Sequence, residues 1–347
     1  MSRIKQAVKA GKYRSFLETR RYAQGVKAAI PVLTVKGRRP GPLAVILACQ
    51  HGRELNGIAA IESAYRQLDP MGMKGTAVFL PVMNPVGLRM HAQDYPTEQP
   101  RYRPTGIAMN MNINRKWRDD VPASDGTYAR EIAASVWDAY LKHADLGLDL
   151  HGWTGCSLSL AWGLKKDLAL LRAFGLPVYI VVNKPAKPTG GMADAAAWAK
   201  GIPMLACELA PQNVIHPEAV RFGSRGILNM LAFMGMREGR LELPETQYEF
   251  QQHHVEMVMR TPVEGLLVSD CVKGQWVLKG QRVLRILSLE TLRTAWEFRA
   301  PCDALAFNIG GVRWGEDMPD NYVVYPGQVV GLLKQPGKII RNAGLGL

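Results

Sequence analysis

The sequence lacks any apolar run long enough to cross a bilayer: its longest stretches, such as Leu43–Cys49, have the length of buried strands. The first residues also lack the apolar segment that a secretory signal needs. The five cysteines lie far apart and include no Cys-x-x-Cys pair, which argues against a disulfide scaffold or a thiolate zinc site. We therefore predict a cytoplasmic protein with no membrane partner.

Acidic side chains are scarce at the N-terminus. Residues 1–50 contain one, Glu18, against eleven basic side chains, so this segment carries +10 of the chain's net charge of +13. Such an excess favours anionic partners. Because this segment has few aromatic side chains and no nucleic-acid motif, we disfavour a nucleic acid as the partner. Binding of an anionic polymer through the basic N-terminus is the non-enzyme alternative.

The remaining composition is that of a globular protein with a sizeable core, since 47% of the 347 residues are hydrophobic and 21% are charged. Strand and helix patterns alternate up to about residue 236, which predicts an α/β sheet with helices on both faces. We expect strands at Ala29–Val35, Leu43–Cys49, Thr76–Pro81, Leu146–Leu150, Val178–Val182 and Met204–Glu208, and helices at Leu55–Leu68, Tyr128–His143, Met192–Lys200 and Pro217–Met236.

The pattern changes near residue 245, where short apolar runs broken by glycine turns replace helical periodicity. This change predicts a smaller all-β domain at the C-terminus. We expect three parts: a basic, helix-prone N-terminal extension over residues 1–28, a main α/β domain over 29–245 and a β-rich domain over 246–347.

Two predicted strands end in side chains that bind metals. His51-Gly-Arg-Glu54 follows the apolar run that ends at Cys49, and His151 follows the run Leu146–Leu150. The carboxyl ends of strands are where α/β sheets place their sites. Two histidines and a glutamate with an open fourth position form a typical catalytic zinc site, in which Asp149 could orient a ligand. The alternative is that these residues only form capping and turn hydrogen bonds.

A third strand end carries a carboxylate, Glu208, after the apolar run Met204–Cys207. Burial there would raise its pKa toward the operating pH and suit it to act as a general base. A partner in a helix cap or a salt bridge is the alternative. In the long polar loop before residue 117, Asn114 and Arg115 offer an amide and a guanidinium fork that can hold a carboxylate. A polar turn with a surface arginine would have the same sequence.

The ordered set of motifs resembles one family. His51-x-x-Glu54, Asn84-Pro85, Asn114-Arg115, Asp149-Leu-His151 and the Glu208 that follows Gly201-Ile-Pro are similar to the succinylglutamate desuccinylase/aspartoacylase family of zinc carboxypeptidase-like hydrolases. The resemblance covers residues 40 to 335. It implies one Zn²⁺ per chain on His51, Glu54 and His151, with Glu208 as the catalytic acid and base. Asn114 and Arg115 would bind the substrate carboxylate, and Arg101 would polarise the scissile carbonyl, with Arg89 and Arg103 as alternatives.

The resemblance implies a mixed-sheet zinc carboxypeptidase-like catalytic domain followed by a barrel-sandwich domain. The activity would be that of a zinc-dependent amidohydrolase that removes the acyl group from an N-acylated amino acid; a metallocarboxypeptidase acting on peptide C-termini is the alternative. A further family arginine, about ten residues before the catalytic glutamate, is replaced here by Trp198, which leaves the acyl group open. The C-terminal domain lacks a carrier lysine between Arg299 and Gly311, so we expect a structural or site-shaping role. The sequence allows a homo-oligomer.

Overall fold

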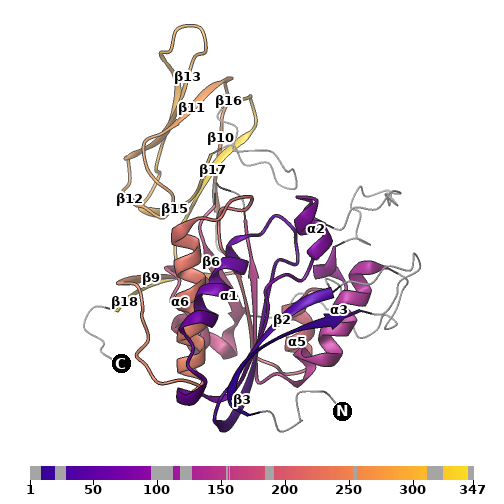
Figure 1. Cartoon of the computed structure of the whole chain (residues 1–347). Coiled ribbons are helices and arrows are strands. Elements are labelled where there is room, and N and C mark those ends of the chain that lie inside the picture. The colour runs from indigo at the N-terminus through magenta and orange to yellow at the C-terminus, as the bar shows by residue number, and fades with distance from the viewer. Residues whose placement is uncertain are drawn as a thin grey trace.

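The protein has a mixed α/β fold, built around one ten-stranded sheet with two four-stranded antiparallel sheets beyond it (Figure 1). A computed structural model describes residues 9–19, 29–94, 112–117, 127–153, 155, 157–183, 191–252, 256–310 and 323–342. The two small sheets project from one end of the main body (Figure 1).

The large sheet is mixed, with a parallel centre. Its strands run in the order β1 (Gly11–Glu18), β2 (Ala29–Lys36), β4 (Lys74–Leu80), β3 (Arg39–Ala48), β5 (Leu146–His151), β8 (Met204–Glu208), β6 (Leu160–Leu164), β7 (Val178–Val182), β9 (Thr246–Gln251) and β18 (Lys338–Arg341). β4, β3, β5 and β8 are neighbours and all run parallel. Their carboxyl ends therefore meet at one edge of the sheet, where ligands bind in sheets of this kind.

Helices cover both faces of this sheet (Figure 1). α1 (Asn56–Gln67), α4 (Leu168–Phe174) and α6 (Pro217–Phe233) pack on one face, and α3 (Tyr128–Ala139) and α5 (Ala193–Ala199) on the other. Side chains of β3 alternate accordingly, because Ile46 faces the first set while Val45 and Leu47 face the second. The short helices are α2 (Pro85–Arg89) and the 3₁₀ turns η2 (Pro70–Gly72), η3 (Ile113–Arg115), η4 (Leu141–His143) and η5 (Lys165–Asp167).

The two small sheets enclose a core of their own. One contains β10 (Glu256–Arg260), β17 (Val329–Lys334), β15 (Ala304–Ile309) and β12 (Trp276–Val277); the other contains β14 (Thr294–Arg299), β13 (Arg282–Leu287), β11 (Gly265–Ser269) and β16 (Val323–Val324). A separate apolar cluster joins them to the large sheet, and within it Phe250 of β9 meets Phe307 of β15 edge to face at 5.6 Å. This contact fixes the small sheets against the main body.

Most predicted elements are confirmed. The ten predicted strands and helices each overlap an observed one, and Val178–Val182 and Met204–Glu208 match exactly. The helical prediction for the N-terminal extension is wrong for residues 11–18: they form β1, an edge strand paired antiparallel with β2.

The division into three domains stays a prediction. β9 and β18 follow residue 245 in the sequence, yet they belong to the large sheet, so this sheet extends beyond the predicted boundary. In the described residues, no helix is long and apolar enough to span a membrane.

Close packing between α1 and α6 gives a testable prediction. A Cβ atom added at Gly223 of α6 would lie 2.7 Å from the Cβ of Ala60 in α1 and 2.6 Å from Cδ1 of Leu209. We expect Gly223→Ala to lower the free energy of unfolding by about 1–3 kcal/mol, because the helices must move apart. Urea unfolding measures the change. Gly72→Ala is the control, since its added Cβ would meet nothing closer than 3.7 Å; equal losses in both variants would contradict the packing argument.

Candidate metal centre

The candidate site lies where the central parallel strands end. His51 follows β3 by three residues, His151 is the last residue of β5, and Glu208 is the last residue of β8. His151 and Glu208 are direct partners in the ladder between β5 and β8, so their side chains leave the sheet on the same face. The sheet thus brings together three side chains that are far apart in sequence.

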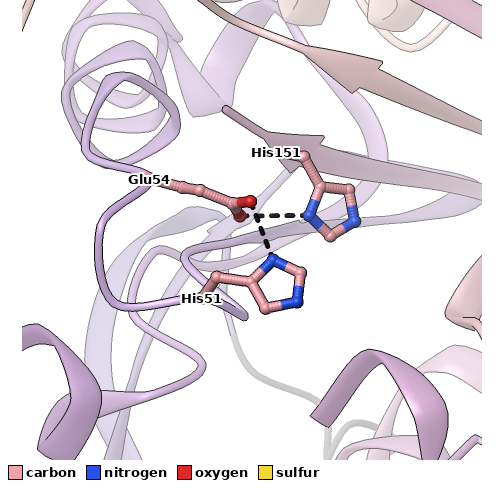
Figure 2. Close-up of side chains that lie close together, drawn as sticks. All are labelled: His51, Glu54 and His151. Carbon is pink, nitrogen blue, oxygen red and sulfur yellow. Dashed lines mark hydrogen bonds and ion pairs between the residues drawn. The ribbon is translucent and has the colours of Figure 1, made fainter. Parts of the chain in front are cut away.

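The three predicted metal ligands converge on one point. His51 Nδ1 lies 2.7 Å from Glu54 Oε1, and His151 Nδ1 lies 3.0 Å from Glu54 Oε2. Figure 2 shows both rings pointing at the one carboxylate. The possible ligand atoms all lie within 4.8 Å of one another, and the three residues are at most 8% exposed. These residues can therefore hold a metal ion. Capping and turn hydrogen bonds alone would not require three ligand atoms so close together.

A tight turn after β3 brings His51 and Glu54 to the same point. Cys49 adopts a left-handed conformation with φ of 55°, which is unusual for a residue other than glycine. The backbone of Asn84 donates to the Cys49 carbonyl at 2.9 Å, and its side chain donates to the Gln50 carbonyl at 3.3 Å. A Cβ at Gly52 would lie 2.1 Å from the carbonyl carbon of Gly87, so only glycine fits there. The Asn84-Pro85 motif thus holds the turn.

Charges in the site are strongly coupled. Burial alone would raise the pKa of Glu54, but the two imidazoles outweigh it and lower the pKa to about 2. Burial would likewise lower the pKa of His51, whereas the Glu54 carboxylate raises it above its usual value. For His151, Asp149 and Glu54 together overcome the burial and raise the pKa well above its usual value. Without a metal, this centre therefore favours a carboxylate and protonated imidazoles.

A buried hydrogen-bond chain orients His151. Its Nε2 lies 2.9 Å from Asp149 Oδ2, as expected for a carboxylate that orients a ligand histidine. The same carboxylate oxygen accepts from Gln50 Nε2 at 2.6 Å, and Gln50 in turn accepts from the indole Nε1 of Trp117 at 2.8 Å. The predicted role of Asp149 is supported by this contact. Nothing in the sequence pattern indicated Gln50 or Trp117.

Glu208 lies beside the metal centre with one oxygen unpartnered. Its Oε2 is buried and has no hydrogen-bond partner among the described residues. Burial raises the pKa of Glu208 well above its usual value; His151 opposes this shift, whereas Glu54 and Asp149 add to it. No ion pair of Glu208 is found in the described part of the chain, so the salt-bridge alternative is not supported. A general base needs a carboxylate oxygen that can accept a proton, and the unpartnered oxygen of Glu208 meets this need.

The predicted substrate-binding residues are only partly placed. Asn114 lies at the centre, where its Oδ1 accepts from the Ala193 backbone at 3.0 Å and its Nδ2 lies 3.1 Å from His151 Nε2. Arg115 donates to the Asn114 carbonyl at 2.7 Å. Their roles toward a substrate stay predictions. Arg101 and Arg103 lie outside the described residues. The alternative Arg89 donates to the Pro85 carbonyl within α2.

Asn112 and Trp162 lie against the ligand histidines, and Asp194 contacts Trp162. Asn112 contacts His51, since its Oδ1 lies 3.1 Å from His51 Nε2. Trp162 of β6 lies nearly parallel to the His151 ring at 6.5 Å between centroids and donates to Asp194 Oδ2 at 2.8 Å. The spacing Asn112-x-Asn114 could have indicated Asn112, but nothing in the sequence indicated the other two.

Comparison with known proteins identifies the family. The model of the succinylglutamate desuccinylase/aspartoacylase catalytic domain matches residues 40–234. The chain belongs to this family. An N-alpha-acetyl-L-2,4-diaminobutyric acid deacetylase from Halomonas elongata is 26% identical over 289 residues, which are 80% of this chain and 79% of that protein.

Solved structures share the fold. A succinylglutamate desuccinylase/aspartoacylase from Rhodobacter sphaeroides superposes with a TM-score of 0.71 at 22% identity, covering 97% of this chain and 100% of that one. The product-bound ectoine utilization protein EutE (DoeB) from Ruegeria pomeroyi also gives 0.71 at 20% identity, covering 95% of this chain and 97% of that one. The fold thus extends over the small sheets as well as the family domain.

Metal affinity should depend on pH in a defined direction. In the metal-free protein Glu54 raises the pKa of His51, and Asp149 and Glu54 raise that of His151, whereas a metal needs the neutral form of both. We therefore expect the affinity for a divalent metal to fall as the pH falls through these raised values, with protons released on binding. Calorimetry in buffers of different ionisation enthalpy measures this release.

The same titration tests the ligand set. Glu54→Gln should abolish stoichiometric binding, whereas Glu62→Gln, at an exposed position of α1, should leave it unchanged. Binding that is independent of pH, or retained in Glu54→Gln, would contradict the proposed ligands.

Proposed function

We propose that the protein is a zinc-dependent amidohydrolase that removes the acyl group from an N-acylated amino acid or a similar small molecule with a carboxylate. The observation that carries this proposal is the convergence of His51, Glu54 and His151 beside the unpartnered oxygen of Glu208. Membership of the desuccinylase/aspartoacylase family supports it. We also propose the cytoplasm as its location, as the sequence predicts.

The donor set fits one zinc ion per chain. Two imidazole nitrogens and a carboxylate, all buried, match the ligands of catalytic zinc sites, which keep a fourth position open. Both histidines turn the same atom, Nδ1, toward Glu54, so in their neutral form these two nitrogens could bind one ion. When bound, zinc would lower the pKa of a water molecule and polarise the amide carbonyl.

Glu208 would move the proton. Its carboxylate accepts a proton from the attacking water, and the carbon–nitrogen bond of the amide breaks after the water oxygen has added to the carbonyl carbon. The same group then donates that proton to the leaving nitrogen, so the products are a carboxylic acid and a free amine. A raised pKa suits both steps, because the group must accept and return a proton near neutral pH.

The substrate's carboxylate would be held by Asn114 and Arg115, and Arg101 would polarise the scissile carbonyl. The acyl group is proposed to be small and neutral. The relative from Halomonas elongata is named as a deacetylase. Trp198, which replaces the additional family arginine, is a buried core residue whose indole donates to the Met204 carbonyl at 2.9 Å. That position therefore offers no cation to an acidic acyl group.

Removing the proposed base should separate chemistry from metal binding. We expect Glu208→Gln to lower kcat by about 10²–10⁴-fold while zinc binding persists, because the amide cannot accept the proton. Steady-state kinetics on an N-acetyl amino acid, with zinc content measured on the same sample, checks this. Glu218→Gln, at an exposed position of α6, is the matched control; turnover retained in Glu208→Gln would refute the assigned role.

A substrate panel tests the reaction itself. We expect hydrolysis of N-acetyl amino acids with kcat/KM about 10-fold or more above that for N-succinyl amino acids, since no cation at residue 198 compensates the extra charge. A chelator should abolish activity and zinc should restore it. Faster cleavage of dipeptides with a free N-terminus would instead favour the metallocarboxypeptidase alternative, because Asn114 and Arg115 could hold a C-terminal carboxylate equally well.

A further inference from the structure

We propose that Asn112 is a positioning residue for the metal centre: its side-chain oxygen holds the remote nitrogen of His51 so that Nδ1 faces the ion. Asn112 Oδ1 lies 3.1 Å from His51 Nε2, on the opposite side of the ring from Glu54. This inference rests on the proposed function only in naming zinc as the ion. It gives a role to a residue that neither the motif nor the expected substrate contacts had used.

The argument follows from the chemistry of imidazole. A neutral ring carries one proton, so an ion can bind Nδ1 only if that proton is on Nε2. The group that faces Nε2 must then accept a hydrogen bond. The side-chain oxygen of Asn112 does so, whereas its NH₂ group would favour the other tautomer and withdraw the lone pair from the ion. Asn112 thereby selects the tautomer of His51 that can bind metal.

The two ligand histidines are held by acceptors of different charge. The Nε2 of His151 faces the carboxylate of Asp149 at 2.9 Å, whereas that of His51 faces a neutral amide. A carboxylate partner makes a ligand histidine more basic than an amide does. His51 is therefore the weaker donor of the two, and the site carries one negative charge fewer than a centre with two such carboxylates would.

Buried neighbours fix Asn112 in place. It stands immediately before η3, whose Ile113 is fully buried in the core beneath the sheet. Four residues further on, Trp117 is also buried, with its backbone donating to the Gly191 carbonyl at 2.8 Å and its indole donating to Gln50. Asn114 lies between these anchors and contacts His151. One short segment thus contacts both ligand histidines, through alternate asparagines.

The test compares three variants by two measurements. Asn112→Leu removes the acceptor and Asn112→Asp supplies a charged one. Asn183→Leu is the control, since Asn183 is exposed and its side chain donates to Gln251 Oε1 at 3.2 Å. The first measurement is zinc affinity by competition with a chelator at fixed pH. The second is the ring Nε2–H resonance of His51, observed by NMR on protein with ¹⁵N-labelled histidine, with and without zinc.

We expect Asn112→Leu to weaken zinc binding by about 10–100-fold and to lose the protected Nε2–H resonance of His51. Asn112→Asp should keep the resonance and bind zinc at least as tightly as the natural chain, and Asn183→Leu should change neither. Zinc binding by Asn112→Leu within twofold of the natural chain, or weaker binding by Asn112→Asp, would overturn the proposal. Should Asn112→Leu fail to fold, the Asn112→Asp result decides alone.

The two measurements also separate this inference from the proposed function. If the natural chain binds no zinc, the proposed function fails, yet the Nε2–H resonance in the metal-free protein still reports whether Asn112 holds His51. Loss of that resonance in Asn112→Leu, with its retention in Asn183→Leu, would then support the contact by itself. Its persistence in Asn112→Leu would overturn the proposed role whether or not zinc binds.

Discussion

The carboxylate of Glu54, shared between two imidazoles, is the contact on which the site depends. Each oxygen of Glu54 lies against one histidine Nδ1, at 2.7 and 3.0 Å, and the residue is only 3% exposed. A buried carboxylate is costly unless it is paired and hydrogen-bonded. In the metal-free protein the histidines supply that compensation. A metal ion at the same place would replace the protons of the two histidines with its own charge. The same arrangement of side chains therefore suits both the metal-free and the metal-bound protein.

The large sheet determines where the side chains that surround the Glu54 carboxylate lie. Because β3, β5 and β8 run parallel and in register, His51, His151 and Glu208 are held at one edge by strands that are buried on both faces. The small sheets approach the same region: Asn308 of β15 donates to Ser157 Oγ at 3.1 Å, in the segment that follows His151. Both of these side chains are buried. The site-shaping role expected for the C-terminal sheets is therefore consistent with where they touch the main body.

The strand-end residues could be predicted because their signal is local. An apolar run that stops at a histidine or glutamate marks both the strand and the group at its carboxyl end, and this holds for His151 and Glu208. The β1 strand was missed because basic side chains interrupt its pattern, and an edge strand needs little burial. The sequence prediction also omits α4 and β6, which have the same lengths as the predicted α5 and β8, so length does not explain their omission. Contacts made by loops, such as Asn112 with His51, depend on chain geometry that no sequence spacing determines.

The place of Glu208 beside a ligand histidine, with one oxygen unpartnered, is the physical basis of its proposed role as a base. Leaving a buried carboxylate oxygen without a hydrogen bond costs about 1–3 kcal/mol. Among the described residues, Glu131 Oε1 and Asp149 Oδ1 share this feature, so the place of Glu208 beside His151 in the ladder between β5 and β8 is what distinguishes it. Asp149, two residues before His151 in β5, has hydrogen-bond partners for Oδ2, whereas its Oδ1 is also unpartnered. Two carboxylates on neighbouring strands thus differ in kind: one is tied to a ligand histidine, and the other is left able to accept a proton. That division of labour between neighbouring acids is what hydrolysis at a metal centre requires of the protein.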